Sequence, residues 1–494
     1  MCAEALRDPL LDAIVAMHEN LPVSLLPILR SRANALAKFT GGSLKVATGC
    51  SGSDIVVLGL RSLTDYWHKI FGVEIAVEHC FSVENVSWKR QFIKEQVGPK
   101  HLFAEMGDMG ADEVFDHITK QKVQVETPHL WICGIECDSV SSVSQHSSQN
   151  TDCVSSGTGA TGTSADYCLR FIEKHKPLFV CFENVKNLDA ASATGGGSNK
   201  AVILERLQAL GYETQDFVMN ANQYGAPQRR PRIYVLAAKK CDEMYLQEFG
   251  LSPARVRGMR IPASSLATCL LPDDHPGLRA WMAEKREKAE NAPTKKARKS
   301  NNYATDHLEI YQSHGVPWPP VYSEEFRAEL DFLPERQKEI GWLLHMVNER
   351  EKANALGKHC EIAQDINMSI GWGTSAWGEV PCIITSSVIL LVERRRLLWG
   401  IEAMRLQMWP SIHGLSSYSH EQLMDLAGNA FCGGCIMGAV IALLMSAEPG
   451  PAAASSSRTR VQELVPFEND TLSLPETQVE DGVVCTSEES SDED

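Results

Sequence analysis

A cysteine and a carboxyl residue that follow apolar strands are the side chains of this sequence best suited to covalent chemistry. The stretch LWICGIECDSVSSVS, residues 130–144, predicts a short buried strand that ends at Gly134, with Cys137 three residues further on. A second apolar strand, within KPLFVCFENVKNL, ends at Glu183. Because ligands collect beyond the carboxyl ends of strands in open α/β sheets, we expect the two side chains to lie close together. A thiolate supplies a nucleophile, and a carboxyl group supplies a general acid or base.

Polar residues at alternate positions begin another strand, in QYGAPQRRPRIYVLAAKK. Alternating residues on a strand share one face, so Gln228, Arg230 and Arg232 are expected to point together. The run after Cys137, which ends near Ala165, is poor in large apolar residues and predicts a loop that closes beside the thiol. Two plainer interpretations stay open at this point, a buried structural cysteine and a solvated basic edge strand.

Glycine and acidic residues follow the first strands of the chain. The stretch LKVATGCSGSDIVVLGL, residues 44–60, predicts a strand, a turn and a helix, and Gly49 and Gly52 would allow a ligand to approach closely. The second strand ends at Glu84, where an acid suits a ribose diol, and a third element ends near Asp108. This series of strand ends favours an adenosine-type site, and solvated loop acids are the alternative.

The elements that must position these residues predict an α/β fold with a doubly wound, mostly parallel sheet and a smaller, irregular lobe. The basic stretch PTKKARK suits a nuclear address. The expected divisions are an N-terminal helical extension over residues 1–40, the α/β domain over 41–240, the lobe over 241–390 with a basic, disordered insert near 284–300, helices that return to the α/β domain over 391–446, and an acidic disordered tail over 447–494.

Composition limits the class of protein. With 494 residues, 44% hydrophobic and 22% charged, the chain suits two or three domains and has no stretch that predicts a membrane span. Its 15 cysteines are scattered, and the Cys432-Gly-Gly-Cys435 pair has no partner pair, so we expect a reducing compartment and no metal site. The net charge is −16, but residues 446–494 hold 12 acidic and 2 basic residues. Since −10 of the charge belongs to that tail, the total does not exclude nucleic acid as a partner.

Taken in order, these motifs resemble those of the cytosine-C5 DNA methyltransferases. VATGCSG resembles the family's F-x-G-x-G-G motif, with Ser51 at one glycine position. GIEC resembles the nucleophile motif G-x-P-C, ENV is intact at residues 183–185, and Q-x-R-x-R is intact at residues 228–232. RRLLWGIEAMRLQ resembles the R-x-L-T-x-R-E-A-x-R-L-Q helix, and GNA at residues 428–430 resembles the closing G-N-x motif.

The resemblance implies transfer of a methyl group from S-adenosylmethionine to C5 of a flipped-out cytosine in DNA. In such chemistry a thiolate adds at C6, an acid relieves charge at N3, and arginines hold O2. The implied catalytic residues are Cys137, Glu183, Arg230 and Arg232. The implied cofactor contacts are Thr48, Gly49, Cys50, Gly52, Glu84, Asn85, Asp108, Met109, Asn429 and Ala430. The lobe over 241–390 would recognise the target, DNA would be the partner, and the nucleus would be the location.

Two residues of the nucleophile motif depart from the family. Glu136 stands where the family has proline, and Asp138 stands where it has glutamine. Carboxylates on both sides of a thiol are expected to raise its pKa and to repel DNA phosphates. Three functions therefore stay open, an active DNA methyltransferase, a weak or inactive homologue that binds nucleic acid or a protein, and an RNA cytosine-C5 methyltransferase.

Overall fold

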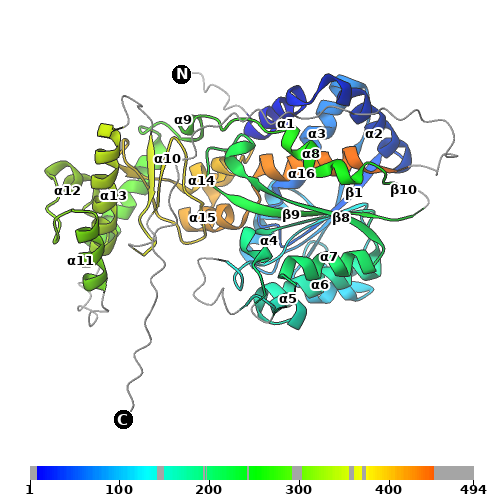
Figure 1. Ribbon diagram of the computed structural model, residues 1–494, viewed down its shortest axis with the longest axis horizontal. Coiled ribbons are helices and arrows are strands. Elements are labelled where there is room, and N and C mark those ends of the chain that lie inside the picture. Colours follow the sequence, from blue (N-terminus) through cyan, green and yellow to red (C-terminus); the bar gives the residue numbers. More distant parts are fainter. Residues whose placement is uncertain are drawn as a thin grey trace, which may run out of the picture. The chain divides into compact units, whose positions relative to one another are not determined.

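A seven-stranded sheet forms the centre of the protein (Figure 1). The computed structural model describes residues 8–141, 150–192, 195, 197–241, 244–291, 303–354, 361–369 and 374–449. In their order across the sheet, the strands are β3 (His101–Phe103), β2 (Ala76–Val83), β1 (Ser43–Gly49), β6 (Leu130–Gly134), β7 (Phe179–Val185), β9 (Pro231–Lys239) and β8 (Tyr212–Asn220). Neighbouring strands pair in parallel except at β9, which is antiparallel to β7 and to β8.

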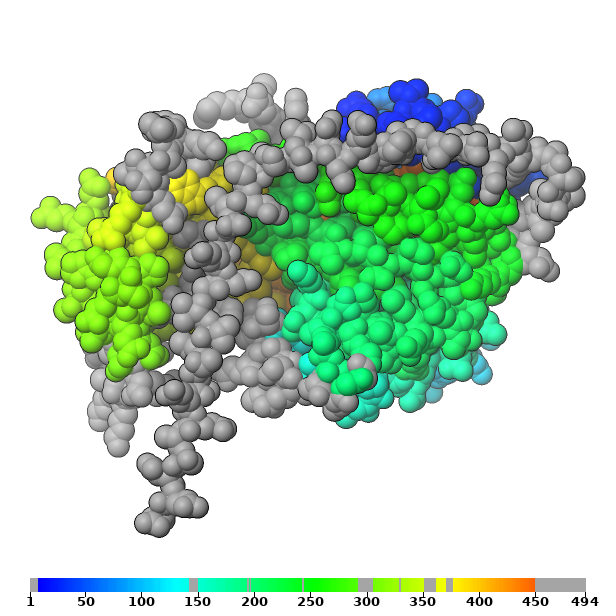
Figure 2. Space-filling view, viewed as in Figure 1, coloured from blue at the N-terminus to red at the C-terminus, as the bar shows by residue number. Residues whose placement is uncertain are grey.

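Helices cover both faces of this sheet, which confirms the predicted doubly wound α/β fold (Figure 1). The helices on one face are α1 (Pro9–Asn20), α2 (Leu26–Phe39), α3 (Ile55–Phe71), α8 (Ser252–Gly258) and α16 (Gly433–Ser446). Those on the other are α5 (Cys153–Ser156), α6 (Gly159–His175) and α7 (Asn199–Ala209). In the space-filling view the segment from α7 to α8 (green) forms one continuous surface (Figure 2). This agrees with the fold, because the segment includes β8, the edge strand of the sheet.

The central strands are buried on both faces because their side chains alternate between two apolar cores. On β6, Leu130 and Ile132 join the core that also contains side chains of α1, α3 and α16. Trp131 and Cys133 join the core that contains side chains of α6 and α7. Near-continuous apolar runs are typical of parallel strands with helices on both faces. Polar groups are therefore concentrated where these strands end.

A second region, between β9 and the last helices, has a small antiparallel sheet of its own. Its strands, in their order across that sheet, are β12 (Thr374–Trp377), β11 (Ile362–Asp365), β13 (Ile389–Leu391) and β14 (Arg396–Leu397). Its helices are α9 (Leu266–Cys269), α10 (Pro276–Glu290), α11 (Tyr303–Ser313), α12 (Glu324–Leu330) and α13 (Glu335–Asn354). Val380 forms an isolated β-bridge with Gln228, which joins this region to the chain just before β9.

The remaining elements lie around the sheet and connect the second region back to it. They are α4 (Ser87–Gln96), the hairpin of β4 (Glu113–Phe115) and β5 (Lys122–Gln124), α14 (Gly400–Leu406) and α15 (His420–Asn429). Arg396 pairs with Glu402 across 2.8 Å, and Glu402 also accepts the backbone N–H of Leu271 at 2.8 Å. This buried pair explains why the arginine–glutamate helix motif is needed to hold the second region together.

The loop that the sequence predicts after Cys137 is shorter than expected. Residues 142–149 lie outside the described part of the chain, but α5 begins at Cys153 and α6 at Gly159, so the prediction of a loop as far as Ala165 was wrong. The small residues of this stretch serve close packing. A Cβ atom on Gly162 would come within 2.0 Å of the Cys153 carbonyl oxygen.

The C-terminal part of the described chain lies in the protein interior. The stretch His420–Ser446 is apolar and long enough to cross a membrane, but its apolar 18-residue window is 89% buried within the fold, as in the core helices of folded domains. β15 (Glu448–Pro449) then pairs with β10 (Met244–Tyr245). The basic stretch PTKKARK and the acidic residues beyond 449 lie outside the described residues.

Candidate active site

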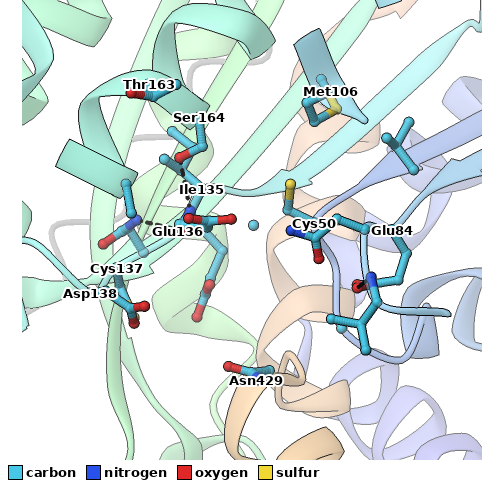
Figure 3. A pocket seen from close by; sticks show the side chains of 18 of the residues that line it. Cys50, Glu84, Met106, Ile135, Glu136, Cys137, Asp138, Thr163, Ser164 and Asn429 are labelled. Atoms are coloured by element: carbon cyan, nitrogen blue, oxygen red, sulfur yellow. Dashed lines mark hydrogen bonds between the residues drawn. The ribbon is translucent and has the colours of Figure 1, made fainter. Parts of the chain in front are cut away.

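A cavity of about 600 Å³ lies at the carboxyl ends of β1, β2, β6 and β7. Cys137 and Glu136 lie on one side of it and Cys50 and Glu84 on the other (Figure 3). The strand order reverses between β1 and β6, where open α/β sheets bind their ligands, and the volume is typical of a small-molecule site. The predicted residues that line it are Cys50, Gly52, Glu84, Asn85, Cys137, Glu183, Arg230, Arg232 and Asn429.

Three predicted cofactor residues lie behind this lining. Thr48 is fully buried and donates to the Ser82 hydroxyl at 3.1 Å. Gly49 leaves no space for a side chain, because a Cβ atom there would lie 2.6 Å from the Trp131 ring. Ala430 contributes its carbonyl oxygen to the Arg230 guanidinium at 2.9 Å. These residues support the walls of the cavity and do not line it.

At the third strand end, the acid that lines the cavity is not the one that the sequence predicts. Asp108 is exposed and Met109 is fully buried, and neither lines the cavity. Glu105 and Met106 line it instead. β3 ends at Phe103, which places Glu105 nearer to the strand end than Asp108, but a strand of three residues gives no sequence signal for its end.

The glycine turn after β1 lies against the end of α15. Cys50 and Gly52 both have a positive φ, of 51° and 71°, in the left-handed region that favours glycine. A Cβ atom on Gly52 would lie 2.8 Å from the Asn429 carbonyl oxygen. The turn and the Gly-Asn-Ala segment therefore approach one another closely, and together they form one edge of the cavity.

Glu84 and Asn85 are held by the helix that follows them. Glu84 accepts the Val86 backbone N–H at 2.8 Å, and Arg90 donates to the carbonyl oxygens of Glu84 and Asn85 at 2.7 Å each. Burial raises the pKa of the Glu84 carboxyl, and its hydrogen bond with Val86 opposes that rise. The strand end is therefore rigid, with a carboxyl group at the cavity.

A buried lysine, which the sequence analysis missed, connects α4 to the Gly-Asn-Ala segment. Lys89 lines the cavity and forms an ion pair with Asp425 at 3.0 Å. Asp425 in turn accepts the Asn429 side-chain amide at 2.8 Å. This chain of contacts fixes Asn429 at the edge of the cavity. The position of Lys89 in an amphipathic helix gave no signal that its side chain would reach the cavity.

Cys137, Glu183 and Arg232 form the opposite side of the cavity. Arg232 Nε lies 3.3 Å from Glu183 Oε1 in a buried ion pair. Burial raises the pKa of Glu183, against the opposing charges of Arg232 and Arg230. Burial also raises the pKa of the Cys137 thiol; Arg232 lowers it, while Glu183 and Asp138 raise it further. A thiol and a carboxyl group that retains its proton to higher pH than usual therefore face the same space.

The Arg230 guanidinium joins its own segment to two others, one at Ile383 and one at residues 428–430. It donates to the carbonyl oxygens of Ile383 at 2.8 Å, of Gly428 at 2.8 Å and of Ala430 at 2.9 Å. These bonds occupy both terminal nitrogens, so Arg230 braces the cavity wall. Arg232 keeps its contact with Glu183, and Gln228, the third residue of the motif, is fully buried and accepts from Gln407 at 3.3 Å.

The two acidic residues of the nucleophile motif have different surroundings. Glu136 is half-buried, and its backbone N–H donates to the Ser164 hydroxyl at 3.2 Å (Figure 3). Burial raises the pKa of Glu136, and Asp138 and Glu105 raise it further. Asp138 is exposed and contributes to the raised pKa of the Cys137 thiol. The expected charge effect on the nucleophile therefore comes from Asp138.

One group of side chains outside the cavity has donor atoms close enough to hold a metal ion. The donor atoms of Glu78, Cys80 and Glu126 lie within 4.8 Å of one another. Glu126 forms ion pairs with Lys45, at 3.3 Å, and with Lys100. The ammonium groups already balance these carboxylates, and burial raises the pKa of the Cys80 thiol to about 12. The group is therefore best described as an ion-pair cluster.

A glycine turn, an acid at the second strand end and a half-buried thiol opposite them define a class, the α/β enzymes that bind a nucleoside-type cofactor beside a nucleophile. The sequence profile of the family described as C-5 cytosine-specific DNA methylase matches residues 118–437, more than half of the chain. The chain belongs to this family.

Individual relatives agree with this assignment. The DNA (cytosine-5-)-methyltransferase DMT5 of Cryptococcus neoformans var. grubii is 25% identical over 457 residues, which are 88% of this chain and 18% of that protein. The type II methyltransferase M.BsuFI of Bacillus subtilis is 40% identical over 68 residues, 14% of this chain and 16% of that protein. The chain thus matches under a fifth of the length of these relatives. The solved structure of the S. pombe Dnmt2 methyltransferase, at 12% identity, covers 81% of this chain and 98% of its own with a TM-score of 0.39, too weak a likeness to bear on function.

S-adenosylmethionine is the cofactor of this family, and the residues of the cavity fit it. Glu84, at the end of the second strand, suits the two hydroxyl groups of a ribose. The glycine turn provides a backbone that a ligand can approach closely, since a Cβ atom at Gly52 would fill the contact with Asn429. Glu105 and Asn85 supply further polar groups on the same side.

Proposed function

We propose that this protein transfers a methyl group to C5 of cytosine in DNA through a covalent adduct with Cys137. The observation that carries the proposal is the meeting of Cys137 with the Glu183–Arg232 ion pair, 3.3 Å long, in the same cavity as the cofactor residues. Cytosine C5 is a weak nucleophile, and it becomes a strong one only when another nucleophile adds at C6. A thiol beside a carboxyl acid is the arrangement that this addition needs.

Each side chain has a role that follows from its surroundings. The Cys137 thiolate adds at C6 of the base, and after methyl transfer the loss of the C5 proton expels the thiolate and restores the ring. Burial raises the pKa of Glu183, which favours its role as the acid that donates a proton at N3 as negative charge develops there. Arg232 holds the Glu183 carboxyl in place, and its positive charge would stabilise negative charge on the base. Arg230 positions the wall that carries them through its three carbonyl contacts.

The other side of the cavity binds and orients the cofactor. S-adenosylmethionine, when bound, supplies a methyl group carried on a sulfonium sulfur. Glu84 accepts hydrogen bonds from the ribose, and Glu105 and Asn85 bind the adenine end, in place of the predicted Asp108 and Met109. Cys50, Gly52 and Asn429 close the edge of the cavity. Cys137 lies on the opposite side of the cavity (Figure 3). We therefore propose that the base binds there with C5 toward the cofactor.

DNA is the proposed substrate, with the target cytosine flipped out of the duplex. A base inside a double helix cannot reach a thiol that is half-buried in a cavity, so it must leave the stack. The second region, residues 241–390, is proposed to recognise the target, since its Ile383 carbonyl already forms part of the catalytic wall. A nuclear location is proposed from the basic stretch PTKKARK.

Methyl transfer to defined nucleic acids tests this function. The purified chain is incubated with tritiated S-adenosylmethionine and with duplex DNA, the same duplex without cytosine, or an RNA of the same sequence. The proposal predicts label in 5-methylcytosine of the cytosine-containing DNA alone. Label in RNA would establish the RNA enzyme, and binding of the cofactor without any transfer would establish an inactive homologue.

A further inference from the structure

Asp54 begins α3 in a conformation that an aspartate rarely adopts. Its φ of 59° and ψ of 25° lie in the left-handed region, and its side chain is fully buried. An aspartate that precedes a helix usually accepts a backbone N–H of the first turn, but the Asp54 side chain forms no such bond. Backbone strain without capping indicates that the carboxylate is required elsewhere, and such strain collects at functional sites.

Both carboxylate oxygens of Asp54 accept hydroxyl groups from segments that reach the cofactor cavity. Oδ1 accepts the Ser51 hydroxyl, and Oδ2 accepts the Ser82 hydroxyl. Thr48 donates to Ser82 at 3.1 Å and so extends the cluster to the end of β1. All four side chains are buried. In a buried site of this kind hydrogen bonds are strong, and loss of one partner leaves the others unsatisfied.

The histidine in contact with this cluster does not balance the charge of Asp54. His79 Nε2 lies 3.0 Å from the Ser82 hydroxyl oxygen and 3.8 Å from Asp54 Oδ2. Burial lowers the pKa of His79 to about 4, although Asp54 favours its protonation. The imidazole is therefore neutral near pH 7, and the hydroxyl groups of Ser51 and Ser82 are what stabilise the carboxylate.

The two serines belong to the two segments that carry the cofactor contacts. Ser51 lies between Cys50 and Gly52, and Ser82 lies two residues before Glu84. The motif that this stretch resembles has glycine where this chain has Ser51, so a glycine there would have no hydroxyl group to offer Asp54. The hydrogen bond between Ser51 and Asp54 therefore depends on a residue that distinguishes this chain from the family motif.

We propose that Asp54 is a positioning residue for S-adenosylmethionine, which sets the glycine turn against the end of β2 through Ser51 and Ser82. The inference rests on the proposed function only in taking this cavity as the cofactor site. Asp54 itself does not line the cavity, so it acts through the residues that do.

A second buried aspartate provides a matched control. Asp116 is fully buried and accepts the Leu102 backbone N–H at 2.8 Å, the Thr119 hydroxyl at 2.7 Å, and contacts His101 at 3.1 Å. It resembles Asp54 in burial and in its hydroxyl and imidazole neighbours, but it does not line the cofactor cavity or contact the residues described above. A purely structural effect would appear equally in both variants.

The test is calorimetric titration of the full chain with S-adenosylmethionine, alongside thermal unfolding. Asp54→Asn should raise the cofactor Kd by about 10- to 100-fold, the scale of a lost charge-assisted hydrogen bond, while Asp116→Asn leaves the Kd within about twofold. With a saturating cofactor, kcat should stay near the wild-type value while KM for the cofactor rises. An unchanged Kd for folded Asp54→Asn, or an equal rise for Asp116→Asn, overturns the proposal.

A milder variant covers the case in which Asp54→Asn does not fold. Ser51→Ala removes one hydroxyl group and should raise the Kd by about three- to tenfold, the scale of one neutral hydrogen bond. An unchanged Kd for Ser51→Ala would then overturn the proposal. Failure of the proposed function would look different, because the wild-type chain would bind the cofactor without transferring methyl groups to DNA, or would not bind it at all.

Discussion

The side of the cavity that holds Cys137 and Glu183 is joined to the second region of the chain by hydrogen bonds. The side that holds Glu84 is joined by hydrogen bonds to other parts of the central sheet. Arg230, on the catalytic side, donates to the Ile383 carbonyl of the second region. On the cofactor side, Ser82 is joined to Asp54 within the first strands and α3. Arg230 also donates to Gly428 and Ala430 beside Asn429, so the two sides are linked there. Because Cys137 and Glu183 lie opposite Glu84, we expect substitutions at these three residues to separate methyl transfer from cofactor binding.

The largest expected effect is the loss of the nucleophile. Cys137→Ser should lower methyl transfer by about 10³-fold or more, because a serine hydroxyl is a far weaker nucleophile than a thiolate at neutral pH. The Kd for S-adenosylmethionine should stay unchanged, since the cofactor contacts lie on the other side of the cavity. Tritium transfer and calorimetry measure the two quantities. Equal transfer by Cys137→Ser and wild type would contradict the covalent mechanism.

The next effect concerns the acid that faces the base. Glu183→Gln should lower kcat by about 10²- to 10⁴-fold, because glutamine cannot donate a proton to N3. Burial raises the pKa of Glu183, so its protonated form is lost only as pH rises through that raised value, and wild-type activity should fall on that side. The Gln variant should lack this dependence. A pH profile with the same alkaline decline in both proteins would show that another group causes it.

A smaller effect is expected at the cofactor side. Glu84→Ala should weaken the binding free energy of S-adenosylmethionine by about 1–3 kcal/mol, the scale of a lost charge-assisted hydrogen bond. Asp108→Ala is the matched control, because Asp108 is exposed and lies outside the cavity lining. Calorimetry that finds a larger loss for Asp108→Ala than for Glu84→Ala would restore the sequence-based assignment of the adenine contact.

The smallest expected effect distinguishes the two acids of the nucleophile motif. Asp138 raises the pKa of the Cys137 thiol, so Asp138→Asn should lower that pKa and move the rise of activity to lower pH, with a gain of about two- to fivefold at neutral pH. Glu136→Gln should leave the midpoint in place, because Asp138, and not Glu136, is among the charged groups that raise the pKa of the thiol. Alkylation of Cys137 as a function of pH reports the same midpoint without turnover.

Proline at position 136, the residue of the family motif, would make a less clean comparison. It would remove the carboxyl group and also the backbone N–H that donates to Ser164. Any change in activity would then combine a charge effect with a shift of the turn. Glutamine keeps the N–H and changes the charge alone, which is why we choose it for the comparison.

The sequence indicated the catalytic side better than the cofactor side, for a physical reason. Cys137 follows the fully buried strand β6, and Glu183 lies near the end of the apolar strand β7, so the apolar runs indicate which polar side chains lie at the strand ends. Arg230 and Arg232 alternate on one strand, and both line the cavity. Spacing could not show that Arg230 would use its guanidinium on three carbonyl oxygens, because those partners are about 150 to 200 residues away in sequence.

On the cofactor side, the local pattern was weaker. β3 has three residues, so its end could not be located from apolar spacing, and the sequence analysis placed the third strand end near Asp108. Nothing in the sequence indicated the left-handed conformation of Asp54. The fold class needed only the order of strands and helices, whereas these details depend on contacts between segments that are distant in sequence.

Covalent trapping tests the central claim most directly. The full chain is incubated with S-adenosylmethionine and duplex DNA that carries 5-fluorocytosine at the target position, and the complex is digested and analysed by mass spectrometry. Fluorine at C5 blocks release of the adduct, so the account predicts a stable complex with the base attached to the peptide that contains Cys137, and none with Cys137→Ser. Methyl transfer to ordinary DNA without any such adduct would contradict the account.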